Sequence, residues 1–156
     1  MLTEEVSRGW RGRGLERIPV DLEGWNGFGE NYFPGLLGIH VVEVCHGRCR
    51  LRFQASSHQA PHGYLHGGAV VALADTACGY GCLASLPEGA TGLTTIELKA
   101  NFLGTVNDGA VLTDARLLHA GRRTQVWDAA VMVEQTHRTI AVLRCSQMIL
   151  YPVAAQ

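Results

Sequence analysis

Apolar and polar residues alternate along the chain on both sides of one central apolar segment. The clearest case is 48–53, where Arg48, Arg50 and Arg52 alternate with Cys49, Leu51 and Phe53. Such alternation is typical of a strand with one solvated and one buried face. Glycine-containing turns separate the other strand-like runs. The pattern predicts six strands, at residues 39–44, 48–55, 92–103, 111–119, 123–135 and 139–150.

The central segment, 66–86, is apolar on every side and is closed by Pro87 and Gly89. This predicts one long buried helix, preceded by a loop at 56–65. Its only charged side chain is Asp75. A carboxylate inside an apolar helix is costly unless it is partnered or used in chemistry.

Two strands, a buried helix and four more strands close one core only if the sheet curls around the helix. We therefore expect an α+β domain over 27–152, in which an antiparallel six-stranded sheet surrounds one long helix. Residues 1–26 are rich in Arg, Gly and Glu, which predicts a flexible arm that can include a short helix. Apolar residues at helical spacing between Phe28 and Leu37 predict a short amphipathic helix before Gly38.

Composition supports a globular protein, because 47% of the 156 residues are hydrophobic and 17% are charged. The net charge of −1 points to neither nucleic acid nor an anionic membrane as a partner. An acidic start at 1–5 lacks the features of a signal peptide, so a cytoplasmic enzyme or binding protein is expected.

Five cysteines are present, and Cys45, His46 and Cys49 lie close enough in sequence to suggest zinc. That group falls on a predicted hairpin turn, and no second pair at metal-ligand spacing follows. We expect reduced thiols, mostly in the core, with no metal and no cofactor.

One motif gives the sequence a family resemblance. His66-Gly67-Gly68 is followed by an acidic residue, Asp75, nine positions after the histidine. With 93–102 and 121–123, this segment resembles the hotdog-fold acyl-CoA thioesterases, and most of all their phenylacetate-degradation (PaaI-like) branch. The resemblance covers 33–150. It implies a dimer joined edge to edge, often paired into a tetramer, with Asp75 as nucleophile or general base and the Gly67 N–H polarising the thioester carbonyl.

The same chemistry follows from the residues alone. Free N–H groups at a helix start stabilise the negative charge that develops on a thioester oxygen. Glycines at 67 and 68 let a ligand approach the backbone. The alternative for Asp75 is a structural aspartate that caps a loop or binds Thr76, and the alternative for His66 is a purely capping role.

Spacing adds one inference about assembly. Gly67 and Asp75 are eight residues apart, which is about 12 Å along one helix. One carbonyl cannot touch both groups of one chain. If both act on one thioester, they come from two chains with antiparallel helices.

Four further groups are candidates. The resemblance implies that Thr95, at a position where related enzymes often have Ser or Thr near the catalytic carboxylate, holds the water, with Thr94 as its neighbour. The alternative is that both are ordinary strand threonines. Relatives often carry Asn or Gln six residues before the motif histidine, where this chain has Ala60, so Gln59 or His62 is the expected substitute. Arg122 and Arg123 are candidate contacts for the phosphates of coenzyme A, or serve solubility alone. Arg138 and Lys99 are weaker candidates.

The leading hypothesis is an acyl-CoA thioesterase acting on an aryl or medium-chain acyl group. A non-catalytic acyl-CoA-binding protein and a hotdog dehydratase or hydratase are the alternatives. Apolar and aromatic residues that can contact the acyl group are Tyr64, Leu65, Tyr80, Phe102 and Leu103.

Overall fold

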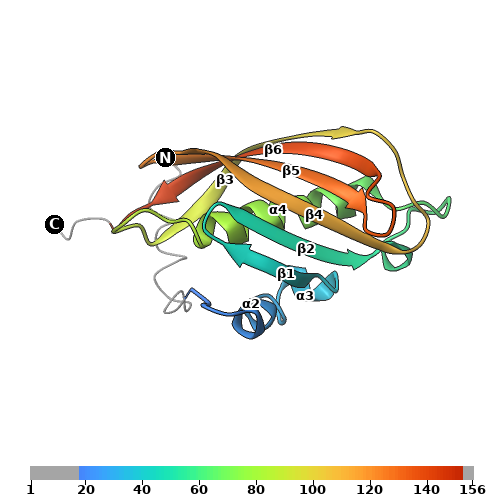
Figure 1. Ribbon diagram of the computed structural model, residues 1–156, viewed down its shortest axis with the longest axis horizontal. Coiled ribbons are helices and arrows are strands. Elements are labelled where there is room, and N and C mark those ends of the chain that lie inside the picture. Colours follow the sequence, from blue (N-terminus) through green and yellow to red (C-terminus); the bar gives the residue numbers. More distant parts are fainter. Residues whose placement is uncertain (1–17, 153–156) are drawn as a thin grey trace.

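A six-stranded antiparallel sheet curls around one long helix in the computed structural model, which describes residues 18–152 (Figure 1). The strand order is β1-β2-β4-β5-β6-β3. The strands are β1 (His40–Cys45), β2 (Arg48–Gln54), β3 (Gly92–Phe102), β4 (Ala110–Ala120), β5 (Thr124–Val133) and β6 (Thr139–Leu150). The helices are α2 (Leu22–Phe28), α3 (Phe33–Leu36), the 3-10 turn η1 (Ala55–Ser57) and α4 (Gly67–Leu83). The predicted hotdog architecture and its six strands are confirmed.

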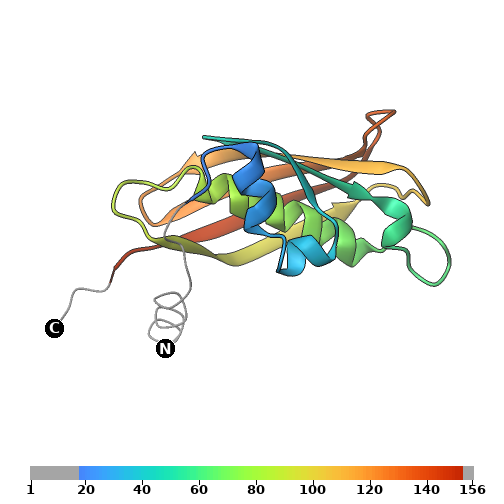
Figure 2. The ribbon, with the colours of Figure 1, turned by 90° about the horizontal axis from the view of Figure 1, so that it is seen from below.

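Helix α4 fills the concave side of the sheet (Figure 2). It begins after His66 and ends at Leu83, three residues earlier than predicted. Gly81 permits the close packing, because a Cβ atom there would lie 2.7 Å from the Trp127 ring. Four of the five cysteines are buried and only Cys45 is exposed, and all five are free. No helix in residues 18–152 is long and apolar enough to cross a membrane.

The structure differs from the expected arm at residues 1–26. Asp21 caps α2 by accepting the Gly24 N–H, and Trp25 on that helix is only 3% exposed. Its ring packs against Phe28 and Tyr80, with centroids 5.7 and 5.2 Å away. The burial of Trp25 fixes this segment on the domain, so the folded unit starts before residue 27. Residues 1–17 of the expected arm lie outside the described residues.

The expected amphipathic helix between Phe28 and Leu37 is also different. Helix α2 ends at Phe28, and α3 is a single turn that begins at Phe33. Gly35 packs so closely on the Glu30 backbone that a Cβ would collide with it. The tight reversal between the two helices prevents one continuous helix.

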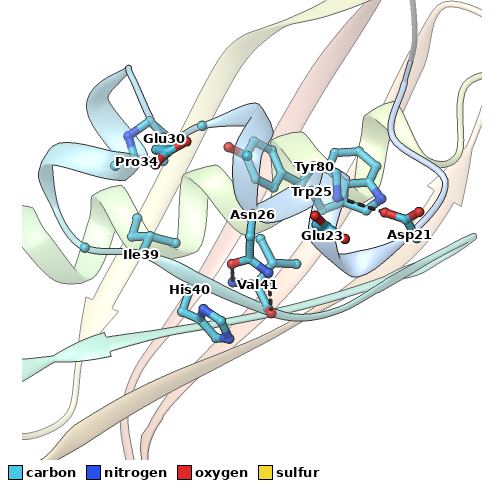
Figure 3. A pocket seen from close by; sticks show the side chains of 15 residues that line it. Asp21, Glu23, Trp25, Asn26, Glu30, Pro34, Ile39, His40, Val41 and Tyr80 are labelled. Carbon is cyan, nitrogen blue, oxygen red and sulfur yellow. Dashed lines mark hydrogen bonds between the residues drawn. The ribbon is translucent and has the colours of Figure 1, made fainter.

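A cavity of about 790 Å³ lies between α2, α3 and β1 (Figure 3). The Asn26 side chain crosses one side of it and binds the β1 backbone, accepting the Val41 N–H at 2.9 Å and donating to the Val41 carbonyl at 3.3 Å. Tyr80 of α4 forms part of the lining, and burial raises the pKa of its hydroxyl to about 12. The helices thus cover the outer edge of β1, and the cavity remains between them and the strand.

Candidate active site

The first turn of α4 has one unused backbone donor. His66 caps the helix: its Nδ1 accepts the Gly68 N–H at 2.9 Å, and its carbonyl accepts the N–H groups of Ala69 and Val70. Among the described residues, no group accepts the N–H of Gly67. His66 therefore has the capping role, and Gly67 is the donor available to a ligand.

A cavity of about 360 Å³ opens onto this turn. Apolar side chains of Leu65, Val70, Phe102 and Ile140 dominate its lining, and His62 and Ala60 are at its margin. A Cβ at position 67 would meet the Phe102 ring at 3.3 Å, so glycine keeps the path to the free N–H open. The cavity therefore leaves room for a ligand beside the start of α4.

Asp75 is half-buried in the middle of α4. Its Oδ1 accepts from the Thr95 hydroxyl at 3.2 Å and from the Cys145 thiol at 3.6 Å. Thr76 instead donates to the Ala72 carbonyl, so it is not the partner of Asp75. No Lys, Arg or His in residues 18–152 forms an ion pair with Asp75. The Asp75 carboxylate is therefore held by two neutral donors and by no cation.

Asp75 does not line the cavity at Gly67 of its own chain. Asp75 belongs to a partly exposed stripe of α4 formed by positions 68, 72, 75 and 79, and Gly67 is partly exposed at the start of the same helix. The structure thus brings Asp75 and Thr95 together and leaves Gly67 with His66 at the helix start.

The remaining candidates fall in different places. The Gln59 side chain donates to the Asn107 carbonyl and so fastens two loops. His62 is beside the cavity with its ring 5.9 Å from that of Tyr64. Thr94 pairs with Met148, and strand alternation puts its side chain on the face opposite that of Thr95.

Arg122 and Arg123 are exposed in the turn between β4 and β5. The Arg122 guanidinium lies over the Tyr151 ring at 5.6 Å. Gln125, at the start of β5, donates to the carbonyl of Ser85 at 2.7 Å, so this turn lies near the C-terminal end of α4. Gly67 of the same chain begins the opposite end of that helix.

Arg138 lies near the start of α4, which its position in the sequence does not indicate. It donates to the Thr105 carbonyl at 2.9 Å, and Thr105 lines the cavity at Gly67. Lys99 is opposite Arg144 in the sheet register, away from this cavity.

Sequence reasoning missed two residues at Asp75, namely Cys145 and Gln147. Gln147 is fully buried on β6; its Oε1 accepts from the Thr95 hydroxyl at 3.1 Å and its Nε2 donates to the Cys145 sulfur at 3.0 Å. Interaction with the Cys145 thiol, together with burial, raises the pKa of the neighbouring Cys78 thiol well above its ordinary value. Alternation along 139–150 predicts burial of both missed residues, but only the strand register shows what they contact.

Comparison with known proteins shows the family of this chain. Residues 62–140 match the thioesterase superfamily. The 1,4-dihydroxy-2-naphthoyl-CoA hydrolase of Listeria monocytogenes is 33% identical over 112 residues, covering 70% of this chain and 89% of that protein. The proofreading thioesterase EntH of Klebsiella pneumoniae is 34% identical over 121 residues, covering 76% and 87%.

A crystal structure of a variant of thioesterase PA1618 from Pseudomonas aeruginosa superposes with a TM-score of 0.78 and 28% identity, over 86% of this chain and 96% of that one. The hotdog fold and the matching family define the class of protein. The chain belongs to the thioesterase superfamily and is a thioester hydrolase.

Proposed function

We propose that this protein hydrolyses acyl-CoA thioesters, with Asp75 activating the attack and the Gly67 N–H holding the carbonyl oxygen. The observation that carries the proposal is the one unused N–H of the α4 first turn, which faces an apolar cavity. As negative charge develops on the oxygen, this donor and the helix dipole stabilise it. Asp75 either removes a proton from the attacking water or attacks the carbonyl itself. The C–S bond then breaks, and coenzyme A leaves with the electron pair and takes up a proton. Where Asp75 is the nucleophile, water then hydrolyses the mixed anhydride formed on Asp75, which releases the acid and restores the carboxylate.

The active site in this proposal is shared by two copies of the chain. Strand β3 is at the end of the sheet and pairs only with β6 among residues 18–152. Its free edge exposes Ile96, Phe102 and Leu103, which are 54%, 54% and 63% exposed. Pairing of two such edges covers this apolar surface and brings the two α4 helices together. In an antiparallel arrangement, Asp75 of one copy faces Gly67 of the other. Pairing of dimers into a tetramer stays a prediction.

Tyr80 gives a place for the acyl group. It follows Asp75 by five residues, about 7.5 Å along α4, and it lines the cavity beside α2. Trp25 and Tyr80 give that cavity an aromatic wall (Figure 3). This supports an aryl or medium-chain acyl group, as does the aryl-CoA named for the Listeria relative. Membership of the PaaI-like branch and a cytoplasmic location remain part of the proposal.

Arginines at the β4–β5 turn fit the nucleotide end of coenzyme A. In the antiparallel dimer, the C-terminal end of α4 in one copy approaches the loop before α4 in the other. Arg122 and Arg123 then come near the second copy's cavity and its His62. We assign them to phosphate binding, so that their loss raises KM and leaves kcat nearly unchanged.

The test is release of free thiol from phenylacetyl-, hydroxyphenylacetyl-, benzoyl- and straight-chain acyl-CoAs. We expect turnover by the wild-type protein and a loss of at least about 100-fold in kcat for Asp75→Asn. Asp128→Asn, which changes a carboxylate on the outer face of the sheet, is the matched control and keeps wild-type turnover. Tight binding of acyl-CoA without turnover would instead identify a binding protein, and near wild-type kcat in folded Asp75→Asn would refute the role of Asp75.

A further inference from the structure

We propose that Gln147 is a positioning residue that holds Asp75 by one carboxylate oxygen, Oδ1, and leaves Oδ2 as the oxygen that reacts. This inference rests on the proposed thioesterase function and assigns the geometry of its carboxylate. Gln147 does not touch Asp75. It acts through Thr95 and Cys145, which both donate to Oδ1.

The contacts converge on a single atom. Oδ1 of Asp75 lies 3.2 Å from the Thr95 hydroxyl oxygen and 3.6 Å from the Cys145 sulfur. Within the described residues, Oδ2 of the same carboxylate has no hydrogen-bond partner. Two donors on one oxygen fix the rotation of the carboxylate group and draw negative charge toward Oδ1. The other oxygen is left free to meet water or the thioester carbon.

Gln147 connects the two donors. Its side-chain amide lies 3.1 Å from Thr95 Oγ1 and 3.0 Å from Cys145 Sγ. In the assigned orientation the amide NH2 donates to Cys145, whose thiol donates on to Asp75. In the flipped orientation the NH2 donates to Thr95, whose hydroxyl donates on to Asp75. In either orientation the amide therefore anchors one of the two donors to Oδ1. The side chain has no exposed surface, and a buried polar group that is fully engaged restricts its neighbours to one arrangement.

The sheet register explains why the amide reaches Thr95. Thr95 and Gln147 are directly opposite each other on β3 and β6. The register then shifts, because Ile96 is an extra residue between Thr95 and Glu97. A bulge at a sheet edge redirects the adjacent side chains. Here it lies immediately beside the threonine that binds Asp75.

The Thr95 hydroxyl has one proton and two acceptors, Asp75 Oδ1 and Gln147 Oε1. A hydrogen bond to an ionised carboxylate is roughly twice as strong as one to a neutral amide, so Thr95 donates to Asp75 while that group is charged. Gln147 then holds Thr95 only through its NH2 group, which donates to the Thr95 oxygen in the flipped orientation of the amide. Without the amide, the side chain that it anchors beside Oδ1 is no longer held.

The neighbouring strand offers a matched control. Gln125 of β5 is opposite Gln147 in the register and is equally buried, at 1% exposed. Its amide donates to the Ser85 carbonyl at 2.7 Å and accepts from the Trp127 indole at 3.0 Å. These bonds fasten the end of α4 and do not reach Asp75. Substitution of Gln125 therefore measures the loss of stability that follows from removing a buried glutamine amide that does not reach Asp75.

The experiment compares Gln147→Met with Gln125→Met in the full chain, with methionine keeping similar volume and length. We expect Gln147→Met to lower kcat at least about tenfold while KM for acyl-CoA stays within about twofold, the pattern of a misplaced reacting group. Gln125→Met should lower the melting temperature at least as much, because it leaves two neutral partners unbonded, and keep kcat within about twofold. If Gln147→Met keeps kcat within twofold, the inference is wrong.

Thr95 provides a second test that does not depend on the folding of Gln147→Met. Thr95→Val should lower kcat at least about tenfold, and Thr95→Ser, which restores the hydroxyl, should recover most of that loss. Equal kcat values for the two variants would overturn the inference. Failure of the wild-type protein to release thiol from every acyl-CoA refutes the proposed function and this inference with it. Normal wild-type turnover with unaffected Gln147→Met refutes only the inference.

Discussion

The two edge strands of the sheet differ in whether their outer sides are covered. At the β1 edge, the Asn26 amide binds both backbone groups of Val41, and α2 covers the strand with the buried Trp25 ring. At the opposite edge, β3 pairs with β6 on one side only, no other strand in residues 18–152 pairs with its outer side, and apolar side chains such as Ile96 are exposed. The Thr95 and Asp75 contact is beside this open edge.

The difference separates stability from function. An exposed strand edge is a site for pairing with another chain, and proteins usually cover or charge it. This chain covers β1 with its own helix and leaves β3 open and apolar, next to the carboxylate. We infer that the closed edge stabilises the single copy and that the open edge assembles the active site. The following predictions test that division, from the largest expected effect to the smallest.

Ile96→Lys at the open edge should have the largest effect. A lysine there opposes edge pairing through its charge and its desolvation cost. We expect a monomer with kcat/KM lowered at least about 100-fold, because each site would lose one of its two parts. Light scattering after size exclusion, together with thiol release, measures both. Leu118→Lys, which replaces an apolar residue 58% exposed on β4, is the control and should remain a dimer. A fully active Ile96→Lys monomer would contradict the shared site.

Complementation sharpens the same point. Asp75→Asn and Gly67→Val are each expected to be inactive, the second because a side chain at 67 presses on Phe102 and blocks the free N–H. A heterodimer of the two has one site with both lesions and one with neither. Mixed and refolded protein should regain up to about half of the wild-type activity per heterodimer. Heterodimers that are confirmed by mass but remain inactive would show that the two groups do not act on one thioester.

Asn26→Ala at the closed edge should affect stability. Removal of the amide leaves the N–H of Val41, a residue only 3% exposed, without its acceptor. The expected loss is about 1–3 kcal/mol in the free energy of unfolding, measured by chemical denaturation. Asn31→Ala changes an exposed asparagine near α3 and should stay within about 0.5 kcal/mol of wild type. Equal losses in the two variants would mean that the Val41 contact adds nothing.

The smallest effect is expected between the edges, on the outer face of the sheet. Hydrogen bonds from Arg144, at 2.6 and 2.7 Å, hold the pKa of Asp128 below its usual value. A lowered folded-state pKa adds stability above the unfolded value of about 4, and this stability is lost as the pH falls further. Because both side chains are about half exposed, Asp128→Asn should cost no more than about 0.5 kcal/mol at pH 7. The difference should vanish in unfolding measured near pH 2. A loss that persists there would have another origin.

Most helices and strands of the core, and the main candidate site residues, could be predicted from the sequence. Alternation with a period of two predicted all six strands, and the unbroken apolar run predicted α4. The candidate site at Asp75 and Gly67 could also be predicted, because one charge in an apolar helix and a glycine pair at its start are local features of the sequence. The hydrogen bond between Asp75 and Thr95 shows that these two side chains are neighbours, and the role expected for Thr95 stays a prediction.

Tertiary structure alone decided which distant residues complete these elements. The Thr95 and Gln147 side chains are 52 positions apart in sequence and meet only through strand register. Residues 22–26 were predicted as part of an arm, and together with residues 27 and 28 they form α2, whose Trp25 ring packs against the Tyr80 ring. The sequence by itself determined the periodic elements and the reactive groups, since these depend on neighbours along the chain. The structure determined the anchor of Asp75 and the cover of β1, because buried hydrogen bonds and aromatic packing depend on neighbours in space.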